Sequence, residues 1–257
     1  MTQTSQASYT SATAAFAEGN FRVGRVLSQT MSVLSHRLVT FFIVSFVAFV
    51  PVIVLQKATA SVERDPAQAL TMVGVSLAML VLMLVLNMLS SAVILHGAFQ
   101  DMRNRPVSLA ESLQVGLRRF LPLMGLAFLV ALLMVIGLIF FIIPGLFLYT
   151  IWFVSVAACV VERTGAWASM RRSRELTKGH RWKVFGIVLL LIVLSLLNPL
   201  LQLVLTAAGG ETLATIGTAI WTAIGASFSS VLSAVTYYEL RVAKEGIDIE
   251  QIASVFE

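Results

Sequence analysis

The sequence is poor in charge and in cysteine. Asp, Glu, Lys and Arg make up only 12% of its 257 residues, whereas hydrophobic residues make up 58%. A soluble globular domain is typically about one quarter charged, so this composition excludes an ordinary soluble domain and indicates a polytopic membrane protein. The one cysteine, Cys159, excludes an internal disulfide and a cysteine-based metal site. It lies in an apolar run, which favours a buried hydrophobic side chain.

The N-terminus lacks the basic start followed by an apolar core that defines a signal peptide. We therefore expect the first membrane span to be retained as an anchor. Residues 1–13 are rich in Ser, Thr, Ala and Gln, a composition that predicts a disordered tail. The membrane domain is expected over residues 14–240 and a cytoplasmic C-terminal tail over residues 241–257.

Six apolar runs predict an all-α fold, a polytopic membrane bundle of six transmembrane helices. A helix needs about 20 predominantly apolar residues to cross a bilayer. A loop is expected over residues 96–106, a tight turn at Pro144-Gly145 and a tight loop over residues 207–210. The sixth run is rich in Ala, Gly and Ser, which predicts a place at the centre of the bundle. The predicted spans are residues 38–55, 70–95, 120–143, 145–161, 184–206 and 212–238.

Three shorter amphipathic segments each precede a pair of spans. The first covers residues 16–35, and the second opens with Ser108 and Glu111 at the spacing of a capping box. The third covers residues 166–178, with Gly179 as its C-cap. Helices with this split of polar and apolar faces lie in the membrane interface. The order predicts a threefold repeat of an interfacial helix followed by a helical hairpin.

The distribution of positive charge predicts the topology. Of the 18 Lys and Arg residues, all except Lys57 and Arg64 fall in the N-terminal segment, the second loop, the fourth loop or the C-terminal tail. Cytoplasmic loops carry an excess of Lys and Arg. We therefore expect both termini and the even-numbered loops on the cytoplasmic side.

The charged stretch between Val161 and Phe185 contains the clearest motif. Residues 161–165 and 172–182 resemble a signature of a bacterial family known as YciC-like, or as the glycerophosphoryl diester phosphodiesterase membrane domain; residues 97–112 and 237–246 are similar to it too. The resemblance covers most of the chain from about Phe16 onward. It implies a six-helix domain of the bacterial inner membrane that associates with lipid. We expect no phosphodiesterase domain in a chain of this length, so the resemblance implies no catalytic residues.

No set of residues predicts catalysis, a cofactor or a metal site. His36, His96 and His180 lie in different loops and have no His, Cys or carboxylate partner at ligand spacing. Neither paired carboxylates nor an activated nucleophile marks a hydrolase. Arg171 and Glu175 are four residues apart, which predicts an ion pair on a helix surface. We therefore expect a protein that is not an enzyme.

The basic cytoplasmic face is the remaining candidate site. Clustered Lys, Arg and Trp at a membrane edge suit anionic lipid headgroups, and the same charges also serve to fix topology. For that reason nucleic acid is not expected as a partner, despite the sequence pI of about 9.8. The predicted lipid-binding residues are Arg118, Arg119, Arg171, Arg172, Arg174, Lys178, Arg181, Trp182 and Lys183.

Two functional hypotheses follow. The first is a non-enzymatic membrane protein that binds anionic lipid, in membrane organisation or as an accessory subunit, with lipids and either another protein or a second copy as partners. The second is a transporter or facilitator of a lipid-like or small apolar solute. Asn87, Asn198 and Gln202 would line its path, although such groups more often form interhelical hydrogen bonds. No predicted span contains a charge, which argues against an ion-driven carrier.

Overall fold

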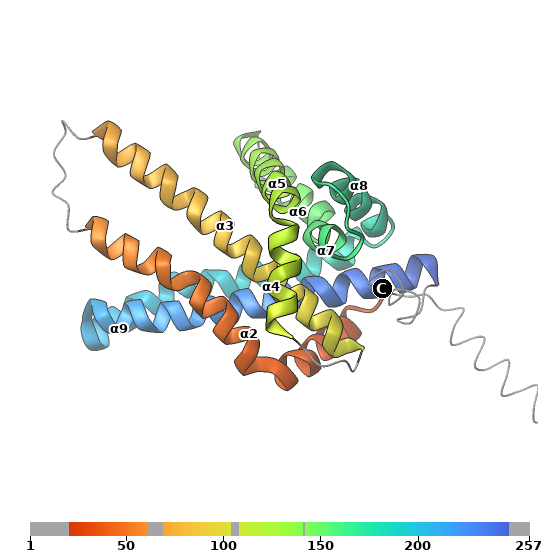
Figure 1. Cartoon of the computed structure of the whole chain (residues 1–257), viewed down its shortest axis with the longest axis horizontal. Coiled ribbons are helices and arrows are strands. Elements are labelled where there is room, and N and C mark those ends of the chain that lie inside the picture. Colours follow the sequence, from red (N-terminus) through yellow and green to blue (C-terminus); the bar gives the residue numbers. More distant parts are fainter. Residues whose placement is uncertain (1–20, 61–68, 104–107, 141, 247–257) are drawn as a thin grey trace, which may run out of the picture.

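The computed structural model describes residues 21–60, 69–103, 108–140 and 142–246 (Figure 1). Within these ranges every regular element is a helix, so the predicted all-α class is confirmed. The helices are α2 (Val23–Ala60), α3 (Ala69–Met102), α4 (Leu109–Arg118), α5 (Phe120–Phe140), α6 (Ile142–Trp152), α7 (Ser155–Val161), α8 (Ala166–Thr177) and α9 (Arg181–Glu245). The predicted N-terminal tail at residues 1–13, and residues 247–257 of the predicted C-terminal tail at residues 241–257, lie outside the described residues.

Helix α9 consists of two arms joined at Gly209 and Gly210, which have non-helical dihedral angles. Gly210 has φ 77° and ψ −175°, a conformation that essentially only glycine adopts. The arms fold back on each other, since Asn198 Nδ2 donates to Thr222 Oγ1 at 3.1 Å and Gly217 leaves room for the side chain of Leu205. Figure 1 shows the two arms side by side. The predicted loop over residues 207–210 therefore corresponds to this bend.

Three helices are long and apolar enough to cross a membrane by length and composition: Val23–Leu55 within α2, Val73–Met102 within α3, and α9. The count rises to four if α4 and α5, which meet at 65°, form one broken span. Gly145–Val161 is apolar but shorter. The described helices are thus compatible with a membrane-embedded protein.

Each predicted interfacial helix ends at a break in the helical backbone. Arg37 (φ −129°, ψ 23°) interrupts α2 at the predicted boundary between the amphipathic segment and the first span. Arg119 (φ −100°, ψ 7°) ends α4, and His180 (φ −118°, ψ 12°) precedes α9. At the start of α4, the Ser108 side chain accepts from the Glu111 amide at 3.3 Å, so this predicted N-cap is confirmed.

Two expected interruptions of helical structure are wrong. Pro144 and Gly145 lie inside the first turn of α6 rather than in a turn between helices, because proline is tolerated where its missing N–H has no intrahelical partner. The expected loop from His96 is helical through Met102, because Ala98 and Phe99 are buried in the core and hold this part of α3 against its neighbours.

Two predicted boundaries also differ from those in the structure. The fourth predicted span is interrupted between α6 and α7, where Phe153 and Val154 are non-helical. Helix α9 continues to Glu245, past the expected start of the tail at residue 241, and ends at Gly246 with φ 61°. Glycine at this left-handed position is a common helix terminator.

The second arm of α9 lies at the centre of the bundle, as its small residues predict. Ala223, Ser227 and Val231 are buried. Ser227 Oγ and Ser45 Oγ are 2.8 Å apart, which joins this arm to α2, and Ser230 donates to Ser91 of α3 at 3.3 Å. Small side chains permit this close approach of backbones.

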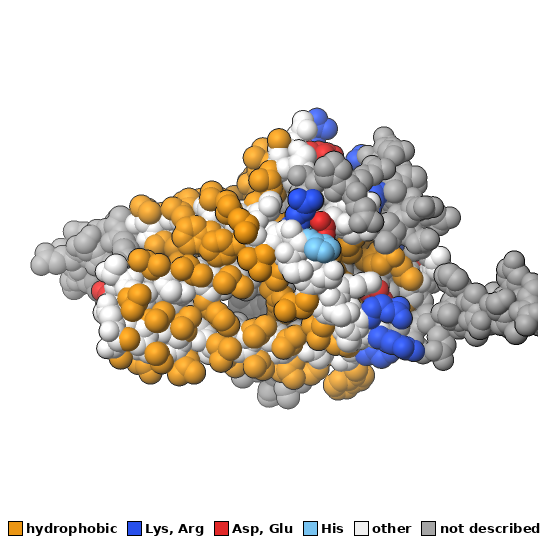
Figure 2. All heavy atoms as spheres, turned by 90° about the horizontal axis from the view of Figure 1, so that it is seen from below, with side chains coloured by type: hydrophobic (Ala, Val, Ile, Leu, Met, Phe, Trp, Pro, Cys, Tyr) orange, Lys and Arg blue, Asp and Glu red, His pale blue; other side chains and the backbone are white. Residues whose placement is uncertain are grey.

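The outer faces of the long helices are apolar. Val39 and Val47 of α2, Leu77 of α3 and Leu203 of α9 are each more than half exposed. On the face shown in Figure 2, hydrophobic side chains gather over the half of the molecule that holds the bend of α9. Exposed apolar surface of this extent is typical of contact with lipid.

Candidate functional site

The described Lys and Arg side chains visible in Figure 2 lie on the half of the molecule away from the apolar surface. The starts of α2 and α9, the ends of α3 and α9, and the helix α8 all contribute charged residues to it. We call this region the charged end. In this region residues that are far apart in the sequence are in direct contact, and the cations differ in the groups that they contact.

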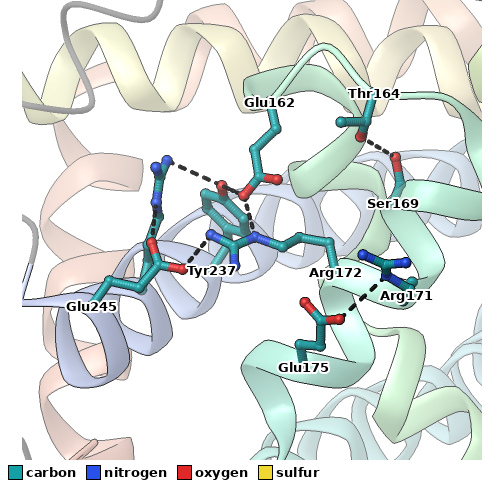
Figure 3. A network of polar contacts seen from close by, with 9 residues as sticks. Glu162, Thr164, Ser169, Arg171, Arg172, Glu175, Tyr237 and Glu245 are labelled. Atoms are coloured by element: carbon teal, nitrogen blue, oxygen red, sulfur yellow. Dashed lines mark hydrogen bonds and ion pairs between the residues drawn. The ribbon is translucent and has the colours of Figure 1, made fainter.

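A network of five side chains ties α8 to the end of α9 (Figure 3). Arg172 Nε donates to Glu162 Oε1 at 2.6 Å, and the other side of the same guanidinium pairs with Glu245. Tyr237 Oη donates to Glu162 Oε1 at 2.7 Å, and Arg241 Nε donates to Glu245 Oε2 at 2.9 Å. Burial lowers the pKa of Arg172, but the hydrogen bonds and charges of the two glutamates outweigh it and raise that pKa overall. Arg172 therefore serves the protein's own packing.

Two further acids hold α2 at the charged end. Asp101, at the end of α3, accepts from Arg37 Nε at 3.2 Å and lies 3.5 Å from His36 Nδ1. Glu239 in α9 lies 3.6 Å from Arg25 NH1. These contacts join the predicted first interfacial segment to both neighbouring helices.

Three of the predicted lipid-binding cations contact backbone or another side chain. Arg119 NH1 donates to the carbonyl oxygen of Arg163 at 2.9 Å, and Lys183 Nζ donates to that of Phe21 at 2.7 Å. Arg171 pairs with Glu175 at 3.3 Å, and both side chains are more than half exposed, so the predicted surface pair is confirmed. A carbonyl oxygen does not neutralise a cation, so Arg119 and Lys183 keep their net charge at the surface.

The remaining predicted residues are exposed or only partly covered. Arg118, Arg174 and Lys178 are exposed and form no ion pair with a described carboxylate. The Arg181 guanidinium lies 5.6 Å from the centre of the Phe147 ring. Trp182 is 84% exposed and meets Phe185 edge to face at 5.9 Å. The junction of α8 and α9 therefore combines unmatched positive charge with a large exposed aromatic side chain.

Lys244 belongs to this junction and was missed as a site residue. It lies in the last turn of α9, and its Nζ donates to the carbonyl oxygen of Glu175 in α8. In the sequence, Lys244 lies 66 residues after Lys178. The end of α8 and the end of α9, which hold these two residues, meet only in the folded chain. Its signals in the sequence were the positive charge of the C-terminal tail and the similarity of residues 237–246 to the YciC-like family.

The break between α6 and α7 exposes carbonyl groups that hydroxyl side chains satisfy. The Ile151 carbonyl oxygen accepts from Ser173 Oγ at 2.7 Å and from Thr177 Oγ1 at 3.4 Å, both in α8. Ser233 of α9 donates to the Phe153 carbonyl oxygen at 3.2 Å. Buried backbone carbonyl groups are nearly always paired in native structures. The break thus fixes α8 and α9 against the fourth predicted span.

A histidine and a serine meet between α3 and α4. His96 Nδ1 and Ser112 Oγ are 2.9 Å apart, a distance suited to a base and a nucleophile. Ser112 is fully buried and His96 nearly so, so no substrate reaches the hydroxyl in this conformation. The contact instead holds the polar side of α4 against α3. Leu109, Leu113 and Leu117, on the other side of α4, are exposed.

The interior polar groups bear on the transporter hypothesis. Asn198 is engaged in the hydrogen bond to Thr222 between the two arms of α9. A half-open cavity of ≈ 130 Å³ at the charged end is lined by Gln29, Ser32, Val33, Met102 and Tyr238. Its lining includes none of the three polar residues that the transporter hypothesis named.

The described part of the charged end therefore offers surface cations and an exposed tryptophan. Among the described residues, no group of three or more His, Cys, Asp or Glu side chains could hold a metal ion. Burial and the charges of Lys183 and Lys244 lower the pKa of His180, which disfavours its charged form. Comparisons of the chain with protein-family models, with curated proteins and with solved structures find no match.

Proposed function

We propose that six helical segments cross the bilayer of a bacterial inner membrane, with the charged end on the cytoplasmic side. The segments are the part of α2 after Arg37, α3, α5, α6 together with α7, and the two arms of α9. The bend at Gly209 and Gly210 supports counting α9 twice, because each arm is long enough to span by itself. Lys and Arg at one end support the orientation.

Within this topology, the proposed threefold repeat rests on the three similar breaks at Arg37, Arg119 and His180. Each break separates a short helix from the first long helix of a pair. The 65° bend between α4 and α5 lets α4 lie along the membrane surface while α5 enters it. The exposed Leu109, Leu113 and Leu117 would then face the lipid. This arrangement matches what the YciC-like resemblance implies, and we propose membership of that family.

The function that the charged end supports best is non-enzymatic binding of anionic lipid, in membrane organisation or as an accessory subunit. The observation that carries this proposal is the junction of α8 and α9. There, Trp182 is 84% exposed beside cations that have no carboxylate partner in the described structure. Tryptophan prefers the membrane interface, and each Lys or Arg near an anionic surface strengthens attachment by about 1 kcal/mol.

Lipid analysis of the purified full chain tests the binding proposal. We expect an anionic phospholipid to be enriched over the zwitterionic lipid of the source membrane. Neutralising Lys178 and Lys183 together should reduce that enrichment, whereas Arg22→Gln, just before α2, and Arg37→Gln, at the break inside α2, should together change it less. Extraction of lipids in the proportions of the membrane, for wild type and variant alike, would contradict lipid binding.

Labelling of single cysteines tests the topology separately. In a Cys159→Ser background, Lys178→Cys should react with a membrane-impermeant maleimide only after the inner face is opened. Ala207→Cys, beside the bend of α9, should react from the outside of intact cells. Equal reactivity of both positions from one side would show that the arms of α9 do not cross the membrane.

A further inference from the structure

The junction of α8 and α9 gathers three cations that the described carboxylates do not neutralise. Lys178 follows the last turn of α8, Arg181 begins α9, and Lys244 reaches the Glu175 carbonyl oxygen from the far end of α9. We call Lys178, Arg181 and Lys244 the basic corner. Nearby Arg172 and Arg241 differ, because both are paired with Glu245.

Arg181 is the least satisfied member of the basic corner. Its guanidinium lies 5.6 Å from the centre of the Phe147 ring, and its Nε is buried without a hydrogen-bond partner among the described residues. Leaving such a donor unsatisfied is costly, and more so for a charged group. A bound anion beside the guanidinium would offset the positive charge of this side chain.

The three charges act on one another. Burial lowers the pKa of Lys244, and the positive charge of Lys178 lowers it further; the Glu175 carboxylate opposes this by raising it, and Arg172 and Arg181 add smaller lowering effects. Lys244 lies beyond the predicted end of the sixth span at Tyr238. Mutual repulsion between cations held close together is relieved when an anion lies between them. An anion that accepts several hydrogen bonds at once, such as a phosphate, fits this need.

The surroundings of the basic corner indicate an amphiphile. Trp182, next to Arg181 in the chain, is 84% exposed, and Phe147 is 43% exposed. An ion dissolved in water gains nothing from neighbouring apolar rings, whereas a phospholipid presents its phosphate and its acyl chains side by side. We propose that the basic corner binds the headgroup phosphate of one anionic phospholipid, with the acyl chains lying along Trp182 and Phe147. This inference rests on the proposed function and narrows it to one site.

The test compares two variants of the full chain with equal changes in charge. The corner variant is Lys178→Gln, Arg181→Gln and Lys244→Gln, and the control variant is Arg118→Gln, Arg171→Gln and Arg174→Gln. Phosphatidylglycerol and phosphatidylcholine are titrated separately into each protein in non-ionic detergent, and bound lipid is counted by native mass spectrometry. Inorganic phosphate is added as a competitor in a further series.

We expect the wild type to prefer phosphatidylglycerol and the corner variant to bind it roughly 100-fold more weakly, at about fivefold for each of its three cations. The control variant should stay within about threefold of the wild type, since its three cations lie outside the basic corner and would not contact the bound phosphate. Equal losses of affinity for phosphatidylglycerol in both variants would contradict binding at the basic corner, but they would still be consistent with general binding of anionic lipid. No preference in the wild type would overturn the proposed function as well.

If millimolar inorganic phosphate displaces phosphatidylglycerol, the basic corner recognises free phosphate, and the proposal that its ligand is a phospholipid is wrong. Because the chain has four tryptophans, the fluorescence of Trp182 is taken as the difference between the wild type and Trp182→Phe, and it gives a second measurement if the corner variant does not fold. Saturable change with phosphatidylglycerol, but not with phosphatidylcholine, is expected. Lys178→Glu alone, at an exposed position, should weaken that response, and an unchanged response would contradict the site.

Discussion

Tyr237 donates a hydrogen bond of 2.7 Å to Glu162, which also accepts from Arg172 at 2.6 Å. One carboxylate thus joins the end of α7 to both α8 and α9. Because Glu162 and Arg172 are each less than one quarter exposed, loss of one partner leaves the other charge poorly solvated. The orientation of α8, and with it the basic corner, depends on this contact.

Removing Arg172 should destabilise the protein more than removing its neighbour. Arg172→Ala leaves Glu162 and Glu245 without their shared partner, and we expect a loss of about 1–3 kcal/mol in the free energy of unfolding. Arg171→Ala breaks only the exposed pair with Glu175, which is worth less than about 1 kcal/mol. Thermal unfolding in detergent measures both. Equal effects of the two substitutions would show that the network does not hold α8.

The hydroxyl groups of α8 should act together on the α6–α7 break. In Ser173→Ala, Thr177 can still donate to the Ile151 carbonyl oxygen, so a small loss is expected. The double variant Ser173→Ala, Thr177→Val leaves that carbonyl without either donor, and we expect about 1–3 kcal/mol, more than the sum of the single losses. Thr206→Val, which removes an exposed bond to Gln202 O within α9, is the control. Strict additivity in thermal unfolding would contradict the shared role.

The bend of α9 should require glycine at one position. Gly210 has φ 77° and ψ −175°, so Gly210→Ala should cost about 1–3 kcal/mol. Gly225 lies inside the second arm with open space around its Cβ position, so Gly225→Ala should be neutral or stabilising by up to about 1 kcal/mol. The measurement is the melting temperature in the same detergent. A tolerated Gly210→Ala would mean that the arms do not turn back at this residue.

Ser112 should be inert as a nucleophile despite its contact with His96. The hydroxyl is fully buried between α3 and α4, and a nucleophile must be reachable by its substrate. A fluorophosphonate probe should leave the folded protein unlabelled. Labelling that disappears in Ser112→Ala, while Ser108→Ala keeps it, would reverse this interpretation and indicate a serine hydrolase.

Arg171 and Arg172 show where prediction from sequence ends. Neighbouring residues on a helix point about 100° apart, so one side of α8 meets α7 and α9 while the other stays exposed. Both arginines looked equally suited to lipid from their positions in the sequence. The partners that separate them, Glu175 for the first and Glu162 with Glu245 for the second, include residues from helices that meet only after folding.

Composition and local pattern by themselves determined the helical class, the apolar segments, the Ser108 cap and the break at Gly209 and Gly210. Each of these follows from the transfer energy or backbone freedom of residues close together in the chain. The tertiary structure alone decided that α3 continues past His96 and that hydroxyl groups of α8 and α9 donate to the carbonyl oxygens at the α6–α7 break. It also decided that Lys244 lies near Lys178. Those outcomes depend on which side chains satisfy a buried polar group or a charge, and such partners are set by packing between helices far apart in sequence.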